Sequence, residues 1–165
     1  MDLNHVKEVS TRCFENCLKL KNVNFGDALN KIESEAFENT ALESIDIPET
    51  CTKIVSYAFA NCLELKTIYV SSNVENLGGV FANCYNIETL GTLSNIFQYT
   101  SWDYIDESDV LVNLSTINLI GNSSVYANFA SNLSKLQNVT LQDTITEVGS
   151  NCFTNTAWFN SHPDG

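Results

Sequence analysis

The stretch that decides the fold is YAFANCLELKTIYV, which runs from Tyr57 to Val70. Its pattern is Phe-x-Asn-Cys, followed by a leucine and then by alternating apolar residues. Related copies are RCFENCLKLKNVNF at 12–25, EAFENTALESIDI at 35–47, VFANCYNIETL at 80–90 and NCFTNTAWF at 151–159. Copies that recur every 22–24 residues, as these do, are typical of a solenoid, in which each repeat packs on its neighbours.

The phenylalanines that anchor the copies give the period of the repeat. They are Phe14, Phe37, Phe59, Phe81, Phe129 and Phe153, with spacings of 23, 22, 22, 48 and 24 residues. The spacing of 48 is about two periods. One repeat between Phe81 and Phe129 is therefore degenerate or expanded. We expect a single repeat domain over residues 1–165, with an irregular insertion near residues 91–113.

Each repeat contains one short strand. In LKTIYV (65–70), the apolar Leu65, Ile68 and Val70 flank Thr67 and Tyr69, which is the pattern of a strand with one buried face. The same shape occurs in LKNVNF (20–25), LESIDI (42–47), LSTINL (114–119) and LQNVTL (136–141), with a weaker copy at 87–90. These six strands predict one parallel sheet on one face of the solenoid.

The other face is expected to consist of bends. SEAF (34–37) and SYAF (56–59) predict single helical or 3₁₀ turns that bury Ala and Phe. Asn61 follows this segment, as do Asn16, Asn39, Asn83 and Asn155 in other repeats. We expect these asparagines to be buried and to satisfy backbone groups of the bend.

Three stretches resemble the BspA-type leucine-rich repeat family: IVSYAFANCLELKTIYVSSNV (54–74), ALESIDIPETCTKI (41–54) and NTAWFNSHPDG (155–165). The resemblance covers essentially the whole chain, although LGGVFANC (77–84) is one residue short and SSVYANFAS (123–131) lacks the Ala-Phe pair. It implies a leucine-rich-repeat solenoid with a parallel sheet on one face and short helical or 3₁₀ turns and loops on the other. It also implies an extracellular or cell-surface binding role, such as adhesion to proteins of a host or a neighbouring cell. It implies no catalytic residues.

The charge balance argues against several classes of partner. The chain has 20 acidic and 8 basic residues, a formal charge of -12, and a single arginine, Arg12. Nucleic-acid binding needs clustered positive charge, as does attraction to anionic membranes, so we expect neither. No apolar run approaches the length of a membrane span, and MDLNHVKEVS (1–10) lacks the pattern of a secretory signal. We expect no membrane insertion and no signal or anchor in these residues, and a parent protein that is at the cell surface or secreted.

The six cysteines occupy positions where other repeats have small or apolar residues. Cys17, Cys62 and Cys84 align with Thr40 and Thr156; Cys13 and Cys152 align with Ala36 and Ala58; Cys51 aligns with Val74 and Ile145. We expect mainly buried, reduced thiols. A Cys62–Cys84 disulfide is an alternative that needs oxidising surroundings. A zinc site is a second alternative, but paired C-x2-C modules do not occur. We expect no cofactor and no metal.

The first candidate site is the open face of the sheet. The side chains that alternate with the apolar residues point to this face: Asn22, Asn24, Ser44, Asp46, Thr67, Tyr69, Thr116, Asn118, Asn138 and Thr140. This face is either simply solvated or a protein- or glycan-binding surface of the kind that solenoids present. The candidate ligand-binding residues here are Asp46, Tyr69 and Asn118, and Tyr69 is the expected anchor, since aromatics dominate binding hot spots.

The second candidate site is the segment QYTSWDYIDESDV (98–110). It holds Tyr99, Trp102 and Tyr104 beside four acidic residues. Insertions in repeats form loops that often carry recognition residues, so these three aromatics are further ligand-binding candidates. The alternatives are an insertion that packs on itself and a calcium site, although the ligand order of an EF-hand is missing. N-x-S/T sequons begin at Asn113, Asn122, Asn132 and Asn138.

Three functions remain open. We favour a non-catalytic module that binds a protein or a glycan. A structural spacer without a ligand is the alternative. An enzyme is the least favoured, because His5 and His162 lie at opposite ends and no catalytic motif occurs. Residues 1–12 enter in mid-repeat and SHPDG (161–165) stops where another strand is expected, which favours a piece of a longer solenoid that could self-associate through its ends.

Overall fold

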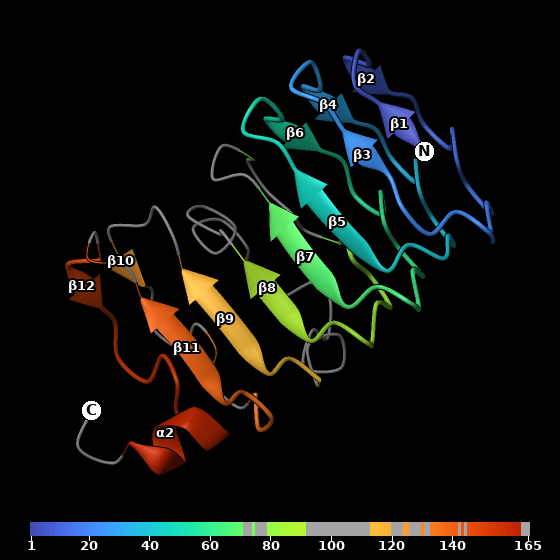
Figure 1. Ribbon diagram of the computed structural model, residues 1–165. Helices are drawn as coiled ribbons and strands as arrows, with labels where there is room; N and C mark the ends of the chain where they lie inside the picture. Colours follow the sequence, from blue (N-terminus) through green and yellow to red (C-terminus); the bar gives the residue numbers. More distant parts are fainter. Residues whose placement is uncertain are drawn as a thin grey trace.

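The computed structural model describes residues 1–70, 74, 79–91, 113–119, 124–125, 130, 133–141, 143 and 145–162. The chain winds in successive turns, and each turn adds a strand beside the previous one (Figure 1). The strands of one face are β1 (Asp2–Leu3), β3 (Asn24–Phe25), β5 (Ser44–Ile47), β7 (Thr67–Val70), β8 (Thr89–Gly91), β9 (Thr116–Leu119) and β11 (Asn138–Leu141). Two-residue strands form a second face: β2 (Glu8–Val9), β4 (Lys31–Ile32), β6 (Lys53–Ile54), β10 (Ser124–Val125) and β12 (Glu147–Val148).

The principal sheet has five strands in the order β11-β9-β8-β7-β5, and every pairing is parallel. The expectation of six leucine-led strands in one sheet is therefore correct for five of them. The segment 20–25 contributes only the two residues of β3, which pairs with β1 in a separate two-stranded sheet. Short parallel ladders also join β2, β4 and β6, and β10 with β12.

The alternating pattern of the strands produces one buried and one exposed face. In β7, Ile68 and Val70 are buried, while Tyr69 is exposed and Thr67 is partly exposed. In β5, the buried Ile45 and Ile47 alternate with the exposed Ser44 and Asp46 in the same way. Because side chains alternate across a strand, every second residue is available to solvent or to a ligand.

The sheet continues past the position of the expected insertion. β8 pairs directly with β9, and Thr89, Leu90 and Gly91 are in register with Thr116, Ile117 and Asn118. The segment 92–112, which carries most of the expected insertion, lies outside the described residues. The extra chain length between these two strands therefore leaves their pairing intact.

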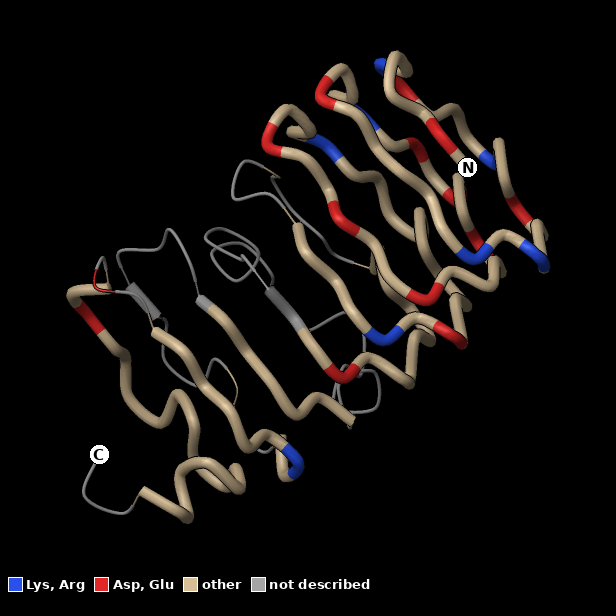
Figure 2. The backbone as a smooth tube through the Cα atoms, viewed as in Figure 1, with Lys and Arg blue, Asp and Glu red and all other residues tan. Residues whose placement is uncertain are grey.

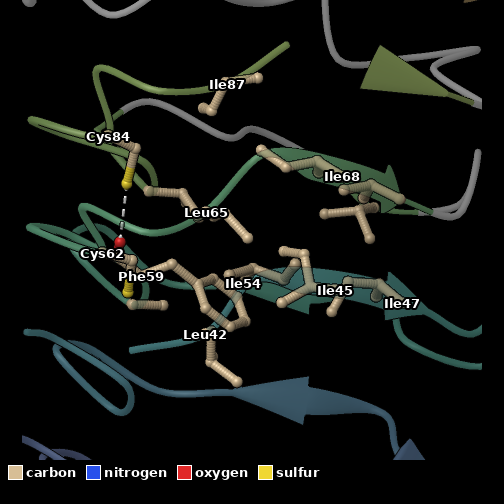
Figure 3. Packing of buried hydrophobic residues seen from close by; sticks show 14 of the residues in the cluster. Leu42, Ile45, Ile47, Ile54, Phe59, Cys62, Leu65, Ile68, Cys84 and Ile87 are labelled. Carbon is tan, nitrogen blue, oxygen red and sulfur yellow. Dashed lines mark hydrogen bonds between the residues drawn. The ribbon is translucent and has the colours of Figure 1, made fainter. Parts of the chain in front are cut away.

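The core lies between the strands and the bends (Figure 3). The buried leucines that precede the strands, such as Leu42 and Leu65, pack beside strand isoleucines, such as Ile45 and Ile68. Phenylalanines from successive bends stack face to face, with ring centroids 5.1 Å apart for Phe14 and Phe37, 5.2 Å for Phe37 and Phe59, and 5.7 Å for Phe59 and Phe81. This stack explains why phenylalanine recurs once in each repeat.

SEAF and SYAF form turns, as expected, and isolated i→i−3 hydrogen bonds of the 3₁₀ type occur in them, for example from Ala36 N to Glu33 O at 3.3 Å and from Ala58 N to Val55 O at 3.2 Å, but neither segment forms a continuous helix. Two residues in each bend have positive φ, for example Glu35 at 58° and Asn39 at 56°, and Tyr57 at 65° and Asn61 at 58°. Left-handed residues four positions apart cannot belong to a right-handed helix. Alternate backbone N–H groups of these bends donate to carbonyls of the next repeat, as Phe37 N does to Ala58 O at 2.7 Å.

The recurring asparagine serves the bend in a different way from the one expected. Asn16 and Asn83 are exposed, and Asn39 and Asn61 are only half-buried. Their positive φ is the reason for the residue type, since asparagine adopts the left-handed conformation more readily than most residues. Their side chains pair along the surface, for example Asn39 Nδ2 with Asn16 Oδ1 at 2.7 Å and Asn83 Nδ2 with Asn61 Oδ1 at 2.9 Å.

Near the C-terminus the repeat pattern gives way to the short helix α2 (Ala157–Ser161). Thr156 caps it, because its Oγ1 accepts a hydrogen bond from Phe159 N at 3.0 Å. Trp158 is partly buried against the core and packs edge-on against Phe153, with ring centroids 5.2 Å apart. This helix mostly precedes the segment 161–165, at which another strand was expected, and residues 163–165 lie outside the described part of the chain.

Candidate functional site

The open face of the five-stranded sheet presents two rows of side chains that cross the strands in register. The first row consists of Asp46, Tyr69, Gly91, Asn118 and Thr140. The second row consists of Ser44, Thr67, Thr89, Thr116 and Asn138. Neighbouring strands lie about 4.8 Å apart, so each row extends about 19 Å across the sheet. The two rows form one continuous polar surface, which we call the open face.

The structure brings together the three open-face residues that the sequence singled out. Asp46 and Tyr69 are direct register partners on β5 and β7, and Asn118 on β9 is the partner of Gly91 on β8. Asp46 is exposed, Tyr69 retains 40% of its accessible surface, and Asn118 is half-buried. Within the described part of the chain, none of these three side chains has a hydrogen-bond or ion-pair partner. No described residue therefore competes with a ligand for their polar atoms.

The open face is almost uncharged, although the chain carries a formal charge of -12. Strands β7, β8, β9 and β11 have the sequences TIYV, TLG, TINL and NVTL, and β5 contributes only Asp46. The colours of Figure 2 show the same separation, with most of the described charged residues around the first turns and at the edges of the sheet. The open face therefore suits a ligand that is recognised by hydrogen bonds and stacking rather than by charge.

Charged residues form a ladder at the edge where the principal strands begin. Lys21 Nζ lies 2.7 Å from Glu43 Oε1, and Lys66 Nζ lies 3.5 Å from Glu88 Oε1. The hydrogen bond from Lys21 lowers the pKa of Glu43 and raises the pKa of Lys21. These residues occupy the same position in successive repeats, directly after the leucine or isoleucine that precedes each strand, and their charges alternate in sign from one repeat to the next. These four charges therefore form ion pairs within the protein.

A second group of charges lies on the bends of the first repeats. One carboxylate oxygen each from Glu15, Glu35 and Glu38 come within 4.8 Å of one another, a spacing that can hold a cation. Arg12 already compensates two of them, because its Nη2 lies 2.6 Å from Glu35 Oε2 and its Nε lies 3.6 Å from Glu15 Oε2. The third carboxylate, that of Glu38, accepts a hydrogen bond from Asn61 Nδ2 at 2.9 Å, so each of the three has a partner within the protein.

All six cysteines are free thiols, and four of them are buried: Cys51, Cys62, Cys84 and Cys152. Cys13 is exposed and Cys17 is half-buried, because they lie in the first repeat, on whose outer side no further repeat packs in this structure. The thiols of Cys62 and Cys84 donate to Phe37 O at 3.3 Å and Phe59 O at 3.1 Å, and the second bond is drawn in Figure 3. These thiols satisfy backbone carbonyls and thereby have a structural role.

The second candidate site cannot be placed, since Tyr99, Trp102 and Tyr104 lie outside the described residues. Two of the sequon asparagines are described. Asn113 Nδ2 donates to Tyr85 O at 2.8 Å, while Asn138 Nδ2 contacts Thr116 Oγ1 at 3.4 Å on the open face. Asn122 and Asn132 are outside the described residues.

Sequence reasoning missed one surface feature. Leu18, Leu63 and Tyr85 are exposed by 64%, 49% and 42%, and each directly follows the cysteine of the Phe-x-Asn-Cys motif. The signal was an apolar residue between the buried cysteine and the buried leucine or isoleucine, at a position that the strand pattern does not include. Tyr85 also donates its hydroxyl to Asn83 Oδ1 at 2.6 Å.

The repeated parallel strands, the stacked bends and the polar open face define a leucine-rich-repeat solenoid. The family model "BspA type Leucine rich repeat region" matches residues 3–104 and 110–161 in six copies, and the chain belongs to this family, a repeat family of bacterial surface-type proteins. No curated protein shows significant similarity to the chain. Among the described residues, no helix has the length and apolar character of a membrane span; α2 has only five residues.

Several solved structures share the fold. A leucine-rich repeat protein from Eubacterium ventriosum is 22% identical with a TM-score of 0.63, over 92% of this chain and 41% of that one. The leucine-rich repeat protein of T. pallidum is 20% identical with a TM-score of 0.62, over 93% of this chain and 71% of that one. One from Bacteroides ovatus is 20% identical with a TM-score of 0.53, over 92% of this chain and 56% of that one. The chain thus spans about half the length of the Bacteroides and Eubacterium proteins, and all three are described as leucine-rich repeat proteins.

Proposed function

We propose that the chain is a non-catalytic binding module of a cell-surface or secreted protein, and that the open face binds a protein or a glycan. The observation that carries the proposal is the row in which Asp46, Tyr69 and Asn118 lie in register with no partner for their side chains in the described part of the chain. A rigid sheet holds these groups in fixed positions, so a ligand can bind them with little reorganisation of the protein.

The polar side chains of other surfaces support this assignment by contrast. On the bends, the asparagines pair with one another and with Glu38, and at the edge of the sheet the lysines pair with glutamates. Those groups stabilise the stacking of repeats. Among the described residues, Asp46, Tyr69 and Asn118 make no such contact, which favours a role outside the fold itself.

The membership of a family of surface-type proteins supports a location at the cell surface. Adhesion to a protein or glycan of another cell is the corresponding function. It needs only an exposed, rigid recognition surface, and the register of the five strands provides that.

The test is a binding screen of the chain against immobilised purified extracellular proteins and oligosaccharides. Tyr69→Ala is the informative variant, and Tyr85→Ala is its matched control, because the two tyrosines are similarly exposed but Tyr85 precedes β8 rather than lying on the open face. The proposal predicts that Tyr69→Ala loses a ligand that Tyr85→Ala retains. Failure of the chain to bind any member of the screen would favour the spacer, and equal binding by both variants would move the site away from the open face.

A further inference from the structure

We propose that the ligand of the open face is a neutral oligosaccharide that lies across strands β5 to β11, an inference that rests on the proposed binding function and names its ligand class. Two observations carry it: the near absence of charge from these strands, and the order of side chains along the first row.

The first row combines an aromatic platform with hydrogen-bonding groups on both sides. Asp46 is the register partner of Tyr69 on one side, and Gly91 is its partner on the other. A glycine has no side chain, so β8 places none beside the tyrosine ring at this register. A sugar ring presents a face of C–H groups, which suits the negative face of an aromatic ring. β8 therefore contributes no side chain that would keep such a ring away from Tyr69 at this register.

The groups that surround the platform match the hydroxyls of a sugar. Asp46 accepts hydrogen bonds, and the amide of Asn118 both donates and accepts. The second row adds the hydroxyls of Ser44, Thr67 and Thr89, which also donate and accept. Sugar hydroxyls have both capacities as well, so one sugar residue can satisfy several of these groups at once.

The shape and charge of the face discriminate against other ligands. Protein interfaces centre on clusters of aromatic and apolar anchors, whereas the described side chains of this face include a single aromatic, Tyr69. An anionic glycan would meet Asp46 and a chain of formal charge -12 without a basic residue on the five strands to receive it. A polar strip about 19 Å long fits an extended chain of sugars better than a compact small molecule, which would require a concave pocket.

The experiment presents the whole chain to an array of neutral oligosaccharides built from glucose, galactose, mannose or N-acetylglucosamine, together with their sialylated and sulfated counterparts. Binders are then titrated by calorimetry at low and high salt. We expect at least one neutral oligosaccharide to bind with an affinity that hardly changes with salt, and its anionic counterpart to bind more weakly.

Variants connect the binding to the row. Tyr69→Ala should weaken binding by about tenfold or more, Tyr69→Phe should keep it within about threefold because the ring remains, and Tyr85→Ala should leave it unchanged. Asn118→Ala should also weaken binding. If no neutral oligosaccharide binds, or if Tyr69→Ala binds as the unmodified chain does, the inference is wrong.

The same variants separate this inference from the proposed function. If the chain binds a purified protein through Tyr69 and binds no oligosaccharide, the binding function stands and the glycan assignment falls. If neither a protein nor an oligosaccharide binds, both fall. An oligosaccharide that binds equally well to Tyr69→Ala would show a glycan site elsewhere on the chain and would overturn the assignment to this row.

Discussion

Replacement of Phe37 tests whether the stacked phenylalanines hold the repeats together. The Phe37 side chain is fully buried and contacts three rings: Phe14 at 5.1 Å, Phe59 at 5.2 Å, and Phe25 edge-on at 5.6 Å between centroids. Truncation of a buried phenylalanine costs about 3–5 kcal/mol of unfolding free energy. We expect Phe37→Ala to lie in the upper part of this range, because the rings on both sides prevent collapse of the cavity.

Phe14→Ala is the matched control from the same stack. Phe14 is only partly buried, and within the described residues its one ring partner is Phe37. Phe37 thus has two more ring partners than Phe14. Because each aromatic pair contributes about 0.5–1.5 kcal/mol beyond burial, the losses of unfolding free energy of the two variants should differ by about 1–3 kcal/mol.

Urea unfolding followed by far-UV circular dichroism measures both values. The slope of free energy against urea should be compared between variants, because a solenoid that unfolds in parts gives a lower slope. A loss below about 1 kcal/mol for Phe37→Ala, or equal losses for the two variants, would show that the ring stack does not hold the repeats together.

Three further predictions concern single positions. Gly26→Ala should destabilise the chain by about 1–3 kcal/mol, because a Cβ at Gly26 would lie 2.4 Å from the Cα and the carbonyl oxygen of Asn4; an unchanged melting temperature would contradict this close approach. In a thiol-reactivity assay, the exposed Cys13 should react fastest, while the buried Cys51, Cys62, Cys84 and Cys152 should react only after unfolding. Burial also raises the pKa of Cys51 to about 11, which disfavours its reactive thiolate. Fast reaction of more than two thiols in the folded chain would refute the burial of these four. The pKa of Glu43 is lowered because Lys21 donates a hydrogen bond to it. Its contribution to stability is therefore present above the ordinary pKa of glutamate and is lost as the pH falls through the lowered value. Glu43→Gln should reduce the loss of stability on acidification, measured as the midpoint of urea unfolding at a series of pH values.

The sequence was sufficient for the features that follow from periodicity. Alternation in LESIDI and LKTIYV predicted which residues of β5 and β7 are buried, and the spacing of the phenylalanines predicted the stack of bends. These features depend on the burial of apolar groups, and the periodic spacing of apolar residues along the sequence indicates which groups are buried. The same argument placed Asp46, Tyr69 and Asn118 on one exposed face.

The conformation of the bends could not be predicted in the same way. Glu35 and Tyr57 adopt positive φ although neither residue type favours it, because the hydrogen bonds between successive bends impose the conformation. The short local segments SEAF and SYAF contain no sign of that constraint. A regularly placed asparagine was the available clue, and its preference for the left-handed conformation explains it better than burial does.

The register beside Tyr69 was also hidden from the sequence. The position of Gly91 opposite Tyr69 depends on how β8 aligns with β7. The pairing of β8 with β9 depends on how two strands that are separated by 24 residues in the sequence come into register. Neither alignment follows from a local pattern. The row from Asp46 to Asn118 therefore became visible only in three dimensions.

One comparison tests the central claim, that the open face is a binding surface rather than part of the fold. It combines Asp46→Ala, Tyr69→Ala and Asn118→Ala in one chain and measures its melting temperature together with its affinity for a ligand of the unmodified chain. We predict that affinity falls by about a hundredfold or more, while the melting temperature changes by only a few degrees, because these side chains have no partners in the described part of the chain. A variant that is folded and binds the ligand as tightly as the unmodified chain would contradict the claim.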